Sequence, residues 1–382
     1  MNNMKNILKI LFTYILIIIF FLPLIEIILS SVDPEQVMVH VEDPDIVYKF
    51  YPEREGIAFT EEYKVNVKID SLSNRDCQKK ENLNQKKILV IGDSFSEGWG
   101  VDCEKIYHYG LNKDFQVYNG GIHGGSMPYY ILKVRQLQKL IQPDMILIQI
   151  FDNDLDDADK VRQFFKWDEN YLREANPRGI VGLPSGFISS YIRETSTFRL
   201  LKRVINALKG FREPIKYYKI SKVPNIPILS HEEAIQKFGK LRNITDYEKE
   251  YNGQFAFYKF KNRSELNGDT LWKNRFENFT FQIKQLFSES RKFNTEIELI
   301  ILYIPSKEAL AGYADYKTYL QKNYFLQLLE ELSSEEKIKL IDSSIYLSKD
   351  PENYYFPGDA HLNAKGHEVL MKALEKETSY LK

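Results

Sequence analysis

The chain has 382 residues, with 52 basic and 53 acidic side chains, and its formal net charge is −1. A nucleic-acid partner calls for a basic excess gathered on one face, so this balance excludes such a partner. The length is sufficient for a substantial hydrophobic core. Core packing is the default role for its 25 Tyr and 24 Phe.

The first predicted element is an apolar segment at residues 10–29, which follows Lys5 and Lys9. About 20 apolar residues suffice to cross the hydrocarbon core of a bilayer, and positive charge before the segment places that side in the cytoplasm. We therefore expect residues 1–32 to anchor the chain in the cell membrane, with the remainder outside the cytoplasm (periplasmic or extracellular). A cleaved signal peptide is the alternative, although Leu29 stands where a cleavage site expects a small residue.

A polar lead-in is expected at residues 33–85. Within it, Tyr63, Val65, Val67 and Ile69 alternate with polar residues. This period of two is typical of a strand with one buried face. The pattern predicts an edge strand or a hairpin before the chain enters its main sheet.

The two cysteines, Cys77 and Cys103, flank the first predicted core strand and the segment that follows it. Outside the cytoplasm such a pair can persist as a disulfide, which would brace this rim of the sheet. Two unrelated thiols are the alternative, since sequence does not supply the Cα separation on which bonding depends.

The strand predicted at 87–91 runs directly into Gly92-Asp93-Ser94. A parallel sheet presents its functional residues at the carboxyl ends of its strands, and a serine hydroxyl becomes a nucleophile when a base lies beside it. Taken alone the tripeptide is weak evidence, because Gly, Asp and Ser are all common turn residues.

Two more apolar runs end in segments that could serve the same site. The run at 115–119 precedes a loop that contains Gly120, Gly121, Gly124 and Gly125, and the run at 145–150 precedes Asp152-Asn153-Asp154. Glycine has no Cβ, so its backbone amide can approach a substrate closely. The glycine-rich segment therefore suits a loop of hydrogen-bond donors.

Residues 159–271 contain proline-broken stretches and short helical patches. A structureless loop of this length is implausible in a compact domain, so we interpret it as a cap inserted over the carboxyl edge of the sheet, where substrate choice would be made. Further elements are expected as strands at 296–303 and 338–341, and as helices at 129–140, 272–287 and 364–381.

Strands and helices alternate along residues 86–382, which we expect to form one catalytic domain. This alternation predicts an α/β fold of three layers, with a parallel, flavodoxin-like sheet of about five strands between two layers of helices.

The last chemical segment, Asp359-Ala360-His361, precedes the final predicted helix. It offers a base and an acid from one short loop, although Asp359 could equally cap that helix. Its occurrence together with the three earlier segments, each at a strand end, favours the functional interpretation, because a motif becomes strong when its structural context agrees.

These four segments, in this order, resemble those of the SGNH/GDSL hydrolase family over residues 87–158 and 338–374. The resemblance implies that Ser94 is the nucleophile, that His361 is the general base, and that Asp359 orients the imidazole. It also implies an oxyanion hole made of the Ser94 and Gly124 backbone amides and the Asn153 side chain. One departure is Phe151, which stands where the family's third segment usually has glycine.

The sequence thus predicts a membrane-anchored serine esterase that acts on acyl groups, with O-acetyl groups of an envelope or secreted carbohydrate as its substrates. A carbohydrate O-acyltransferase that uses the same residues is one alternative. A tethered carbohydrate-binding protein with an idle site is another, and Phe151 favours it. No metal and no cofactor are expected, because the histidines lack metal-ligand spacing, and the oligomeric state is left open.

Overall fold

The structure, a computed structural model, describes residues 40–77, 85–160, 165–168, 171–175, 216–218, 227–239, 256–312 and 315–381, together with Thr13, Phe21, Leu24, Ile25, Ile27 and Ile28. Apart from those six positions, the predicted anchor at 1–32 lies outside the described residues, and so does most of the predicted cap at 159–271. No helix in the described part of the chain is long and apolar enough to span a membrane.

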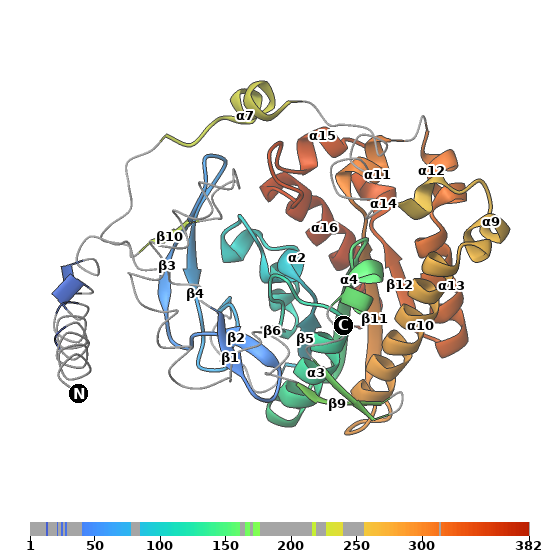
Figure 1. Ribbon diagram of the computed structural model, residues 1–382, viewed down its shortest axis with the longest axis horizontal. Coiled ribbons are helices and arrows are strands. Elements are labelled where there is room, and N and C mark those ends of the chain that lie inside the picture. Colours follow the sequence, from blue (N-terminus) through green and yellow to red (C-terminus); the bar gives the residue numbers. More distant parts are fainter. Residues whose placement is uncertain are drawn as a thin grey trace, which may run out of the picture.

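The centre of the molecule is a five-stranded parallel sheet (Figure 1). Its strands are β5 (Lys87–Ile91), β6 (Gln116–Asn119), β7 (Met145–Phe151), β11 (Glu298–Ile304) and β12 (Lys339–Asp342). They lie in the order β12-β11-β7-β5-β6. All five predicted strands are thereby confirmed, and their nearly unbroken apolar runs are explained by a sheet that is covered on both faces.

Two layers of helices cover this sheet, as predicted. On one face, α3 (Met127–Ile141) packs against α10 (Thr270–Ser290), which contacts α13 (Tyr324–Glu336) through the rings of Phe279 and Phe325, 4.9 Å apart. On the other face, α16 (Ala364–Glu377) packs against the short 3-10 helices η1 (Cys103–Lys105) and η2 (Tyr109–Lys113). Helices α3 and α10 extend slightly beyond the ranges predicted for them, 129–140 and 272–287. Helix α16 instead ends at Glu377, before its predicted end at residue 381.

Shorter helices connect these elements and carry much of the site. They are α2 (Ser94–Glu97), α4 (Asp154–Lys160), α7 (His231–Phe238), α9 (Arg263–Gly268), α11 (Lys307–Ala311), α12 (Tyr316–Lys322), α14 (Ser344–Leu347) and α15 (Pro351–Tyr354), with 3-10 turns η6 (Ala256–Lys259) and η7 (Ser379–Leu381).

The lead-in is more structured than its composition suggested. It forms a hairpin of β1 (His40–Asp43) and β2 (Val47–Phe50), followed by β3 (Glu55–Phe59) and β4 (Lys64–Lys68). The alternation seen in the sequence is real, because Val65 and Val67 of β4 are buried and their neighbours are exposed. As the alternation predicted, β4 forms a hairpin with β3 and lies at the edge of their sheet. This antiparallel sheet, of order β10-β3-β4, is separate from the parallel sheet.

The described pieces of the predicted cap lie in several different places. The hairpin of β8 (Phe165–Asp168) and β9 (Tyr171–Ala175) contacts α3, and β10 (Lys216–Tyr218) pairs with β3. Helix α7 lines a cavity together with Phe356 and Pro357, which precede His361, and η6 lies beside the carboxyl end of β7, where the Tyr258 hydroxyl donates to Asp152 at 3.1 Å. Among the described residues, the predicted cap is therefore represented near that edge by α7 and η6.

Candidate active site

The strand β5 delivers Ser94 to the first position of helix α2. Asp93 caps this helix, and its carboxylate accepts a hydrogen bond from the Phe95 backbone N–H at 2.9 Å. The Asp93 N–H donates to Gln149 Oε1 of the neighbouring strand β7 at 3.1 Å. Gly98 ends the helix with a positive φ of 88°, a conformation that favours glycine. The nucleophile segment is thus fixed by contacts to its own and the adjacent strand.

The structure brings Ser94, His361 and Asp359 together, although 267 positions separate the serine from the histidine. Ser94 Oγ lies 2.6 Å from His361 Nε2, and His361 Nδ1 is hydrogen-bonded to Asp359 Oδ1. The Asp359 carboxylate also accepts from the His361 backbone N–H at 3.1 Å. With the Nδ1 proton directed at Asp359, Nε2 is the acceptor and the Ser94 hydroxyl is its donor.

The charges at this site are tuned by burial and by each other. Burial opposes the charged form of His361, but the charge and the hydrogen bond of Asp359 outweigh it and raise the pKa of the imidazole. Burial alone would raise the pKa of Asp359, yet His361 and further hydrogen bonds hold it well below its ordinary value. Burial raises the pKa of Asp93 to about 6. Asp359 is therefore the carboxylate that stays ionised beside the imidazole.

Two aromatic rings flank the His361 imidazole. Phe95 lies 5.0 Å from it, and Trp99 stacks on it at 5.1 Å. The Trp99 indole N–H also donates to Asp359 Oδ2 at 3.1 Å. Sequence reasoning missed Trp99, although its place five residues after Ser94 could have directed attention to it.

The three predicted oxyanion donors follow neighbouring strands, β5, β6 and β7. Asn153 stands immediately before α4, and its Oδ1 is buried without a hydrogen-bond partner among the described residues. Gly124 has a positive φ of 73°, and its carbonyl accepts a hydrogen bond from the Tyr48 hydroxyl at 2.6 Å. Their roles toward a substrate oxygen stay predictions.

Not every glycine in the loop after β6 serves to present its backbone N–H to a substrate. A Cβ on Gly121 would lie 2.4 Å from the Glu97 backbone nitrogen, so this glycine lets the loop approach α2. Glu97 is buried, and its carboxylate accepts from the His123 backbone N–H at 2.6 Å and lies 2.8 Å from His123 Nδ1. The His123 ring in turn contacts the Trp99 ring, with 5.0 Å between the ring centroids. His123 therefore lies in the wall of the candidate site.

Phe151, which departs from the glycine usual in the family's third segment, lies in a regular strand. It is the last residue of β7, and its N–H donates to Asp154 Oδ2 at 2.8 Å. Its ring packs against Phe95 at 4.5 Å. Because Ile91 pairs with Ile148, the register of β5 and β7 brings Phe151 level with the nucleophile segment.

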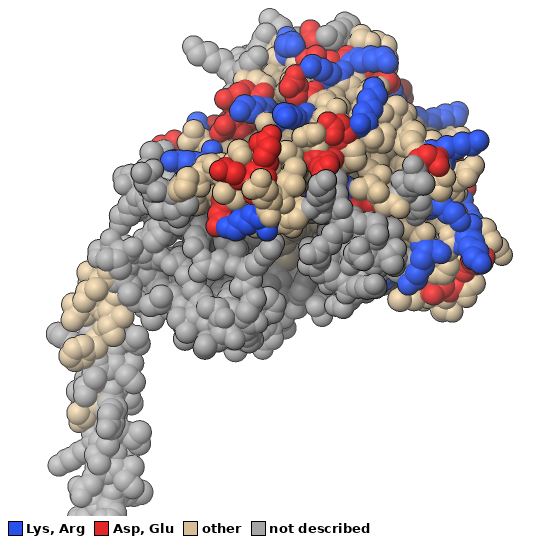
Figure 2. All heavy atoms as spheres, turned by 90° about the horizontal axis from the view of Figure 1, so that it is seen from above, with Lys and Arg blue, Asp and Glu red and all other residues tan. Residues whose placement is uncertain are grey.

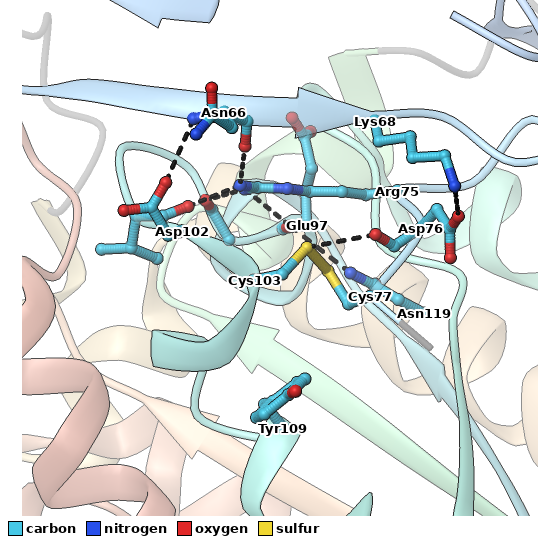
Figure 3. Close-up of a disulfide and its surroundings, with 12 residues drawn as sticks. Asn66, Lys68, Arg75, Asp76, Cys77, Glu97, Asp102, Cys103, Tyr109 and Asn119 are labelled. Atoms are coloured by element: carbon cyan, nitrogen blue, oxygen red, sulfur yellow. Dashed lines mark hydrogen bonds and ion pairs between the residues drawn. A yellow bond between two sulfur atoms is a disulfide. The ribbon is translucent and has the colours of Figure 1, made fainter. Parts of the chain in front are cut away.

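A disulfide joins Cys77 to Cys103, whose Cα atoms are 5.2 Å apart (Figure 3). Beside it, the buried Arg75 guanidinium binds the carbonyls of Gly98 and Val101, the latter at 2.5 Å. Arg75 also donates to the Asn66 carbonyl of β4 at 3.1 Å. The lead-in thus supports the end of α2 from behind, and sequence spacing gave no signal for Arg75.

A cavity of about 320 Å³ lies beside the loop at residues 355–363, between α15 and α16, which carries Asp359 and His361 and is called the acid and base loop below. It is lined by the start of α7 and by residues on either side of His361, such as Phe356 and Lys365, whereas Ser94 is not among its lining residues. On the face shown in Figure 2, basic and acidic side chains of the described residues are interspersed.

No family model and no curated protein matches this sequence. Among solved structures, TesA matches with 12% identity and a TM-score of 0.36, over 78% of this chain and 100% of that chain. A lipolytic protein of the G-D-S-L family from Veillonella parvula matches with 12% identity and a TM-score of 0.36, over 77% of this chain and 98% of that chain. A catalytic mutant of Axe2, an acetylxylan esterase from Geobacillus stearothermophilus, matches with 12% identity and a TM-score of 0.37, over 76% of this chain and 93% of that chain.

The chain is similar to GDSL hydrolases. The matched structure from Veillonella parvula is named as a member of the G-D-S-L family, which is the family that the sequence motifs resemble. Because identity and TM-score are this low, the functional conclusion depends on the geometry of Ser94, His361 and Asp359.

Proposed function

We propose that the chain is a serine esterase of the SGNH type. The observation that carries the proposal is the 2.6 Å contact between Ser94 Oγ and His361 Nε2, together with the hydrogen bond from His361 Nδ1 to Asp359. A serine hydroxyl is a weak nucleophile until a positioned base can accept its proton. These contacts provide such a base and a third group that orients it.

The proposed reaction has two stages. Ser94 Oγ attacks the ester carbonyl while His361 Nε2 takes its proton, and the imidazolium returns that proton to the leaving alcohol. Water then attacks the acyl-enzyme with His361 again as the base, which releases the acid and restores Ser94. Asp359 stabilises the imidazolium in both stages, and Gly124 and Asn153 are proposed to donate to the oxyanion.

The proposed substrates are esters of small acyl groups, with O-acetyl groups of a carbohydrate as the class to test first. The rings of Phe95 and Phe151 occupy the space beside the end of β7, next to the nucleophile segment, and this favours a short acyl chain. The idle-site alternative is not favoured, because the Ser94 contact to His361 is formed with Phe151 present.

We also propose that the enzyme works outside the cytoplasm. The support is the disulfide between Cys77 and Cys103, since such bonds persist in oxidising compartments. The apolar segment at residues 10–29 supplies a candidate anchor.

The test is hydrolysis by the full-length chain in detergent, measured as acid released from aryl acetate, aryl hexanoate and an acetylated oligosaccharide. We expect turnover of the acetates to exceed that of the hexanoate, and Ser94→Ala to abolish it. Ser96→Ala is the matched control, because Ser96 Oγ is buried against Tyr107 at 2.6 Å. Acetate release that survives Ser94→Ala would refute the proposal, and acetylated sugar formed in place of free acetate would favour the acyltransferase.

A further inference from the structure

The loop that carries the acid and the base encloses a lysine ammonium. The loop closes on itself through a 2.9 Å hydrogen bond from the Phe356 N–H to the His361 carbonyl. Lys307 Nζ donates to the carbonyls of Phe356 at 2.8 Å, Pro357 at 3.3 Å and Asp359 at 2.6 Å. The ammonium therefore uses all three of its donors on one short loop.

Lys307 is buried, with 7% of its surface exposed. Burial lowers the pKa of this ammonium, although Glu308 and Asp359 oppose the shift. A buried charge is costly unless hydrogen bonds compensate for its lost hydration. Long lysine side chains usually leave their charge in water, so this buried arrangement indicates a specific role for the contact with the loop.

Lys307 is itself fixed to the end of β7. It is the first residue of α11, whose cap is Ser306, and the Ser306 N–H donates to Asp152 Oδ2 at 2.9 Å. The other oxygen of Asp152 accepts from the hydroxyls of Tyr303 at 2.5 Å and Tyr258 at 3.1 Å. Asp152 immediately precedes Asn153. A chain of hydrogen bonds thus links the predicted oxyanion segment to the acid and base loop.

We propose that Lys307 is a positioning residue that holds Asp359 against His361 by binding the carbonyls of their loop. The inference rests on the proposed esterase function. The loop has other supports, since Glu62 accepts from the Gly358 N–H at 2.9 Å and Trp99 donates to Asp359 at 3.1 Å. The Tyr355 hydroxyl also donates to the Pro305 carbonyl, just after β11, at 2.6 Å. Lys307 is the contact that joins the Asp359 carbonyl to the segment after β11.

The expected consequence follows from the loss of three donors. In Lys307→Met the side chain keeps its length, but three carbonyls lose a partner, so the loop relaxes and Asp359 moves from the imidazole. A displacement of about 1 Å in a catalytic group can cost on the order of 10²-fold in rate. We therefore expect a fall of roughly 10- to 100-fold in kcat for aryl acetate, with little change in KM.

The pH profile separates positioning from a direct charge effect. Loss of the positive charge alone would stabilise the imidazolium and move the acid limb of kcat/KM to higher pH. A weaker Asp359 contact moves that limb to lower pH, because Asp359 is what raises the pKa of His361. Asp93 and Glu97 also face His361 and stay unchanged in the variant. We expect the shift to lower pH.

The experiment compares full-length Lys307→Met, Lys307→Gln and Lys307→Arg in aryl acetate hydrolysis and in the rate of labelling by a fluorophosphonate. Lys87→Met is the matched control, because Lys87 Nζ also binds a carbonyl, that of Ile141 at 3.0 Å, at the opposite end of β5. We expect the arginine variant, which keeps the charge and several donors, to recover part of the loss. The control should keep the wild-type rate and acid limb.

Thermal unfolding monitors whether each variant is folded, and the glutamine variant, which retains an amide donor, takes the place of a methionine variant that does not fold. Labelling at the wild-type rate with an unchanged acid limb would overturn the inference. A shift of the limb to higher pH would overturn it too, in favour of a charge effect. Failure of the wild-type protein to react would instead refute the proposed esterase.

Discussion

The two halves of the candidate site are held in different ways. Ser94 is fixed locally, by β5, by the Asp93 cap and by a hydrogen bond to the adjacent strand β7. His361 and Asp359 lie on a loop between α15 and α16, which takes its supports from distant parts of the chain. The nucleophile half is therefore set mainly by strand and helix geometry, with Arg75 as a remote support of α2, whereas the acid and base half depends on tertiary contacts throughout.

This difference has a mechanical consequence. A substitution near Ser94 has to change a strand register or a helix cap to move the nucleophile, and a packed sheet resists such changes. A substitution at a distant support such as Trp99 can move the imidazole without altering the sheet. The acid and base loop is thus the half that we expect to be sensitive to remote changes.

The largest effects are expected from the acid and base loop itself. His361→Ala removes the base and should lower kcat for aryl acetate by at least 10³-fold, and Asp359→Asn should lower it by roughly 10⁴-fold through loss of imidazole orientation. Substrate binding should persist in both variants, as measured by KM or by inhibition with a slow substrate. His123→Ala, at a residue in the wall of the site that does not contact Ser94, should lower kcat for aryl acetate by less than about tenfold.

The pH dependence of the residual activity of Asp359→Asn tests how Asp359 controls the pKa of His361. The base must be neutral, so kcat/KM falls as pH drops through the pKa of His361, which Asp359 raises above the ordinary value of about 6.5. Without that carboxylate, only the smaller effects of Asp93 and Glu97 oppose the lowering of the His361 pKa by burial. The acid limb should therefore move to lower pH, and an unmoved limb would show that another group controls it.

On the nucleophile half, Asn153→Ala should cost on the order of 10²–10³ in kcat, because a preorganised oxyanion donor is worth about that factor. The loss should appear in kcat rather than in KM, since the donor acts on charge that develops in the transition state. Turnover within twofold of the wild type would remove Asn153 from the site.

Trp99→Phe tests a support of the loop rather than the loop itself. The variant keeps an aromatic ring against His361 but loses the N–H that donates to Asp359. A hydrogen bond to a charged group contributes about 1.5–3 kcal/mol, and we expect roughly tenfold lower kcat with unchanged KM. Wild-type kcat would show that the loop needs no help from Trp99.

The smallest effect on rate is expected at the disulfide. Cys77→Ser with Cys103→Ser opens a cross-link between residues 26 positions apart, and the free energy of unfolding should fall by about 3 kcal/mol. Arg75 still holds the end of α2, so kcat at 25 °C should stay within about twofold of the wild type. Chemical denaturation and acetate turnover measure the two quantities, and a large loss of turnover would show that the nucleophile half also depends on remote contacts.

The same difference explains what the sequence could predict. Strand β5 was predicted with both ends correct, because an apolar run is followed by Gly92, and short apolar runs bounded by glycine are visible without a structure. Ser94 was predicted as the nucleophile because it follows such an element, and His361 and Asp359 were predicted because their segment stands in a recognisable order after it, before the last helix. The predictions were accurate where structure is set by neighbours in sequence.

The remote supports of both halves of the site could not be predicted in this way. Lys307 binds backbone carbonyls about 50 positions away, and Arg75 does so across 23 positions to Gly98. A carbonyl has the same chemistry in every residue, so the acceptor sequence gives no signal for the donor. The pairing of β3 with β10 was missed for a related reason, since it joins segments far apart in the chain, whereas the local hairpin of β3 and β4 was one of the forms predicted for the lead-in.

The most direct test of the account is the site of covalent labelling. The full-length protein is treated with a fluorophosphonate, digested, and examined by mass spectrometry. We predict a single adduct on Ser94, formed at a rate that falls at low pH as His361 is protonated, and no adduct in Ser94→Ala. An adduct on Ser96 or Ser126, or no adduct on the folded protein, would contradict the assignment of Ser94 as a nucleophile activated by His361.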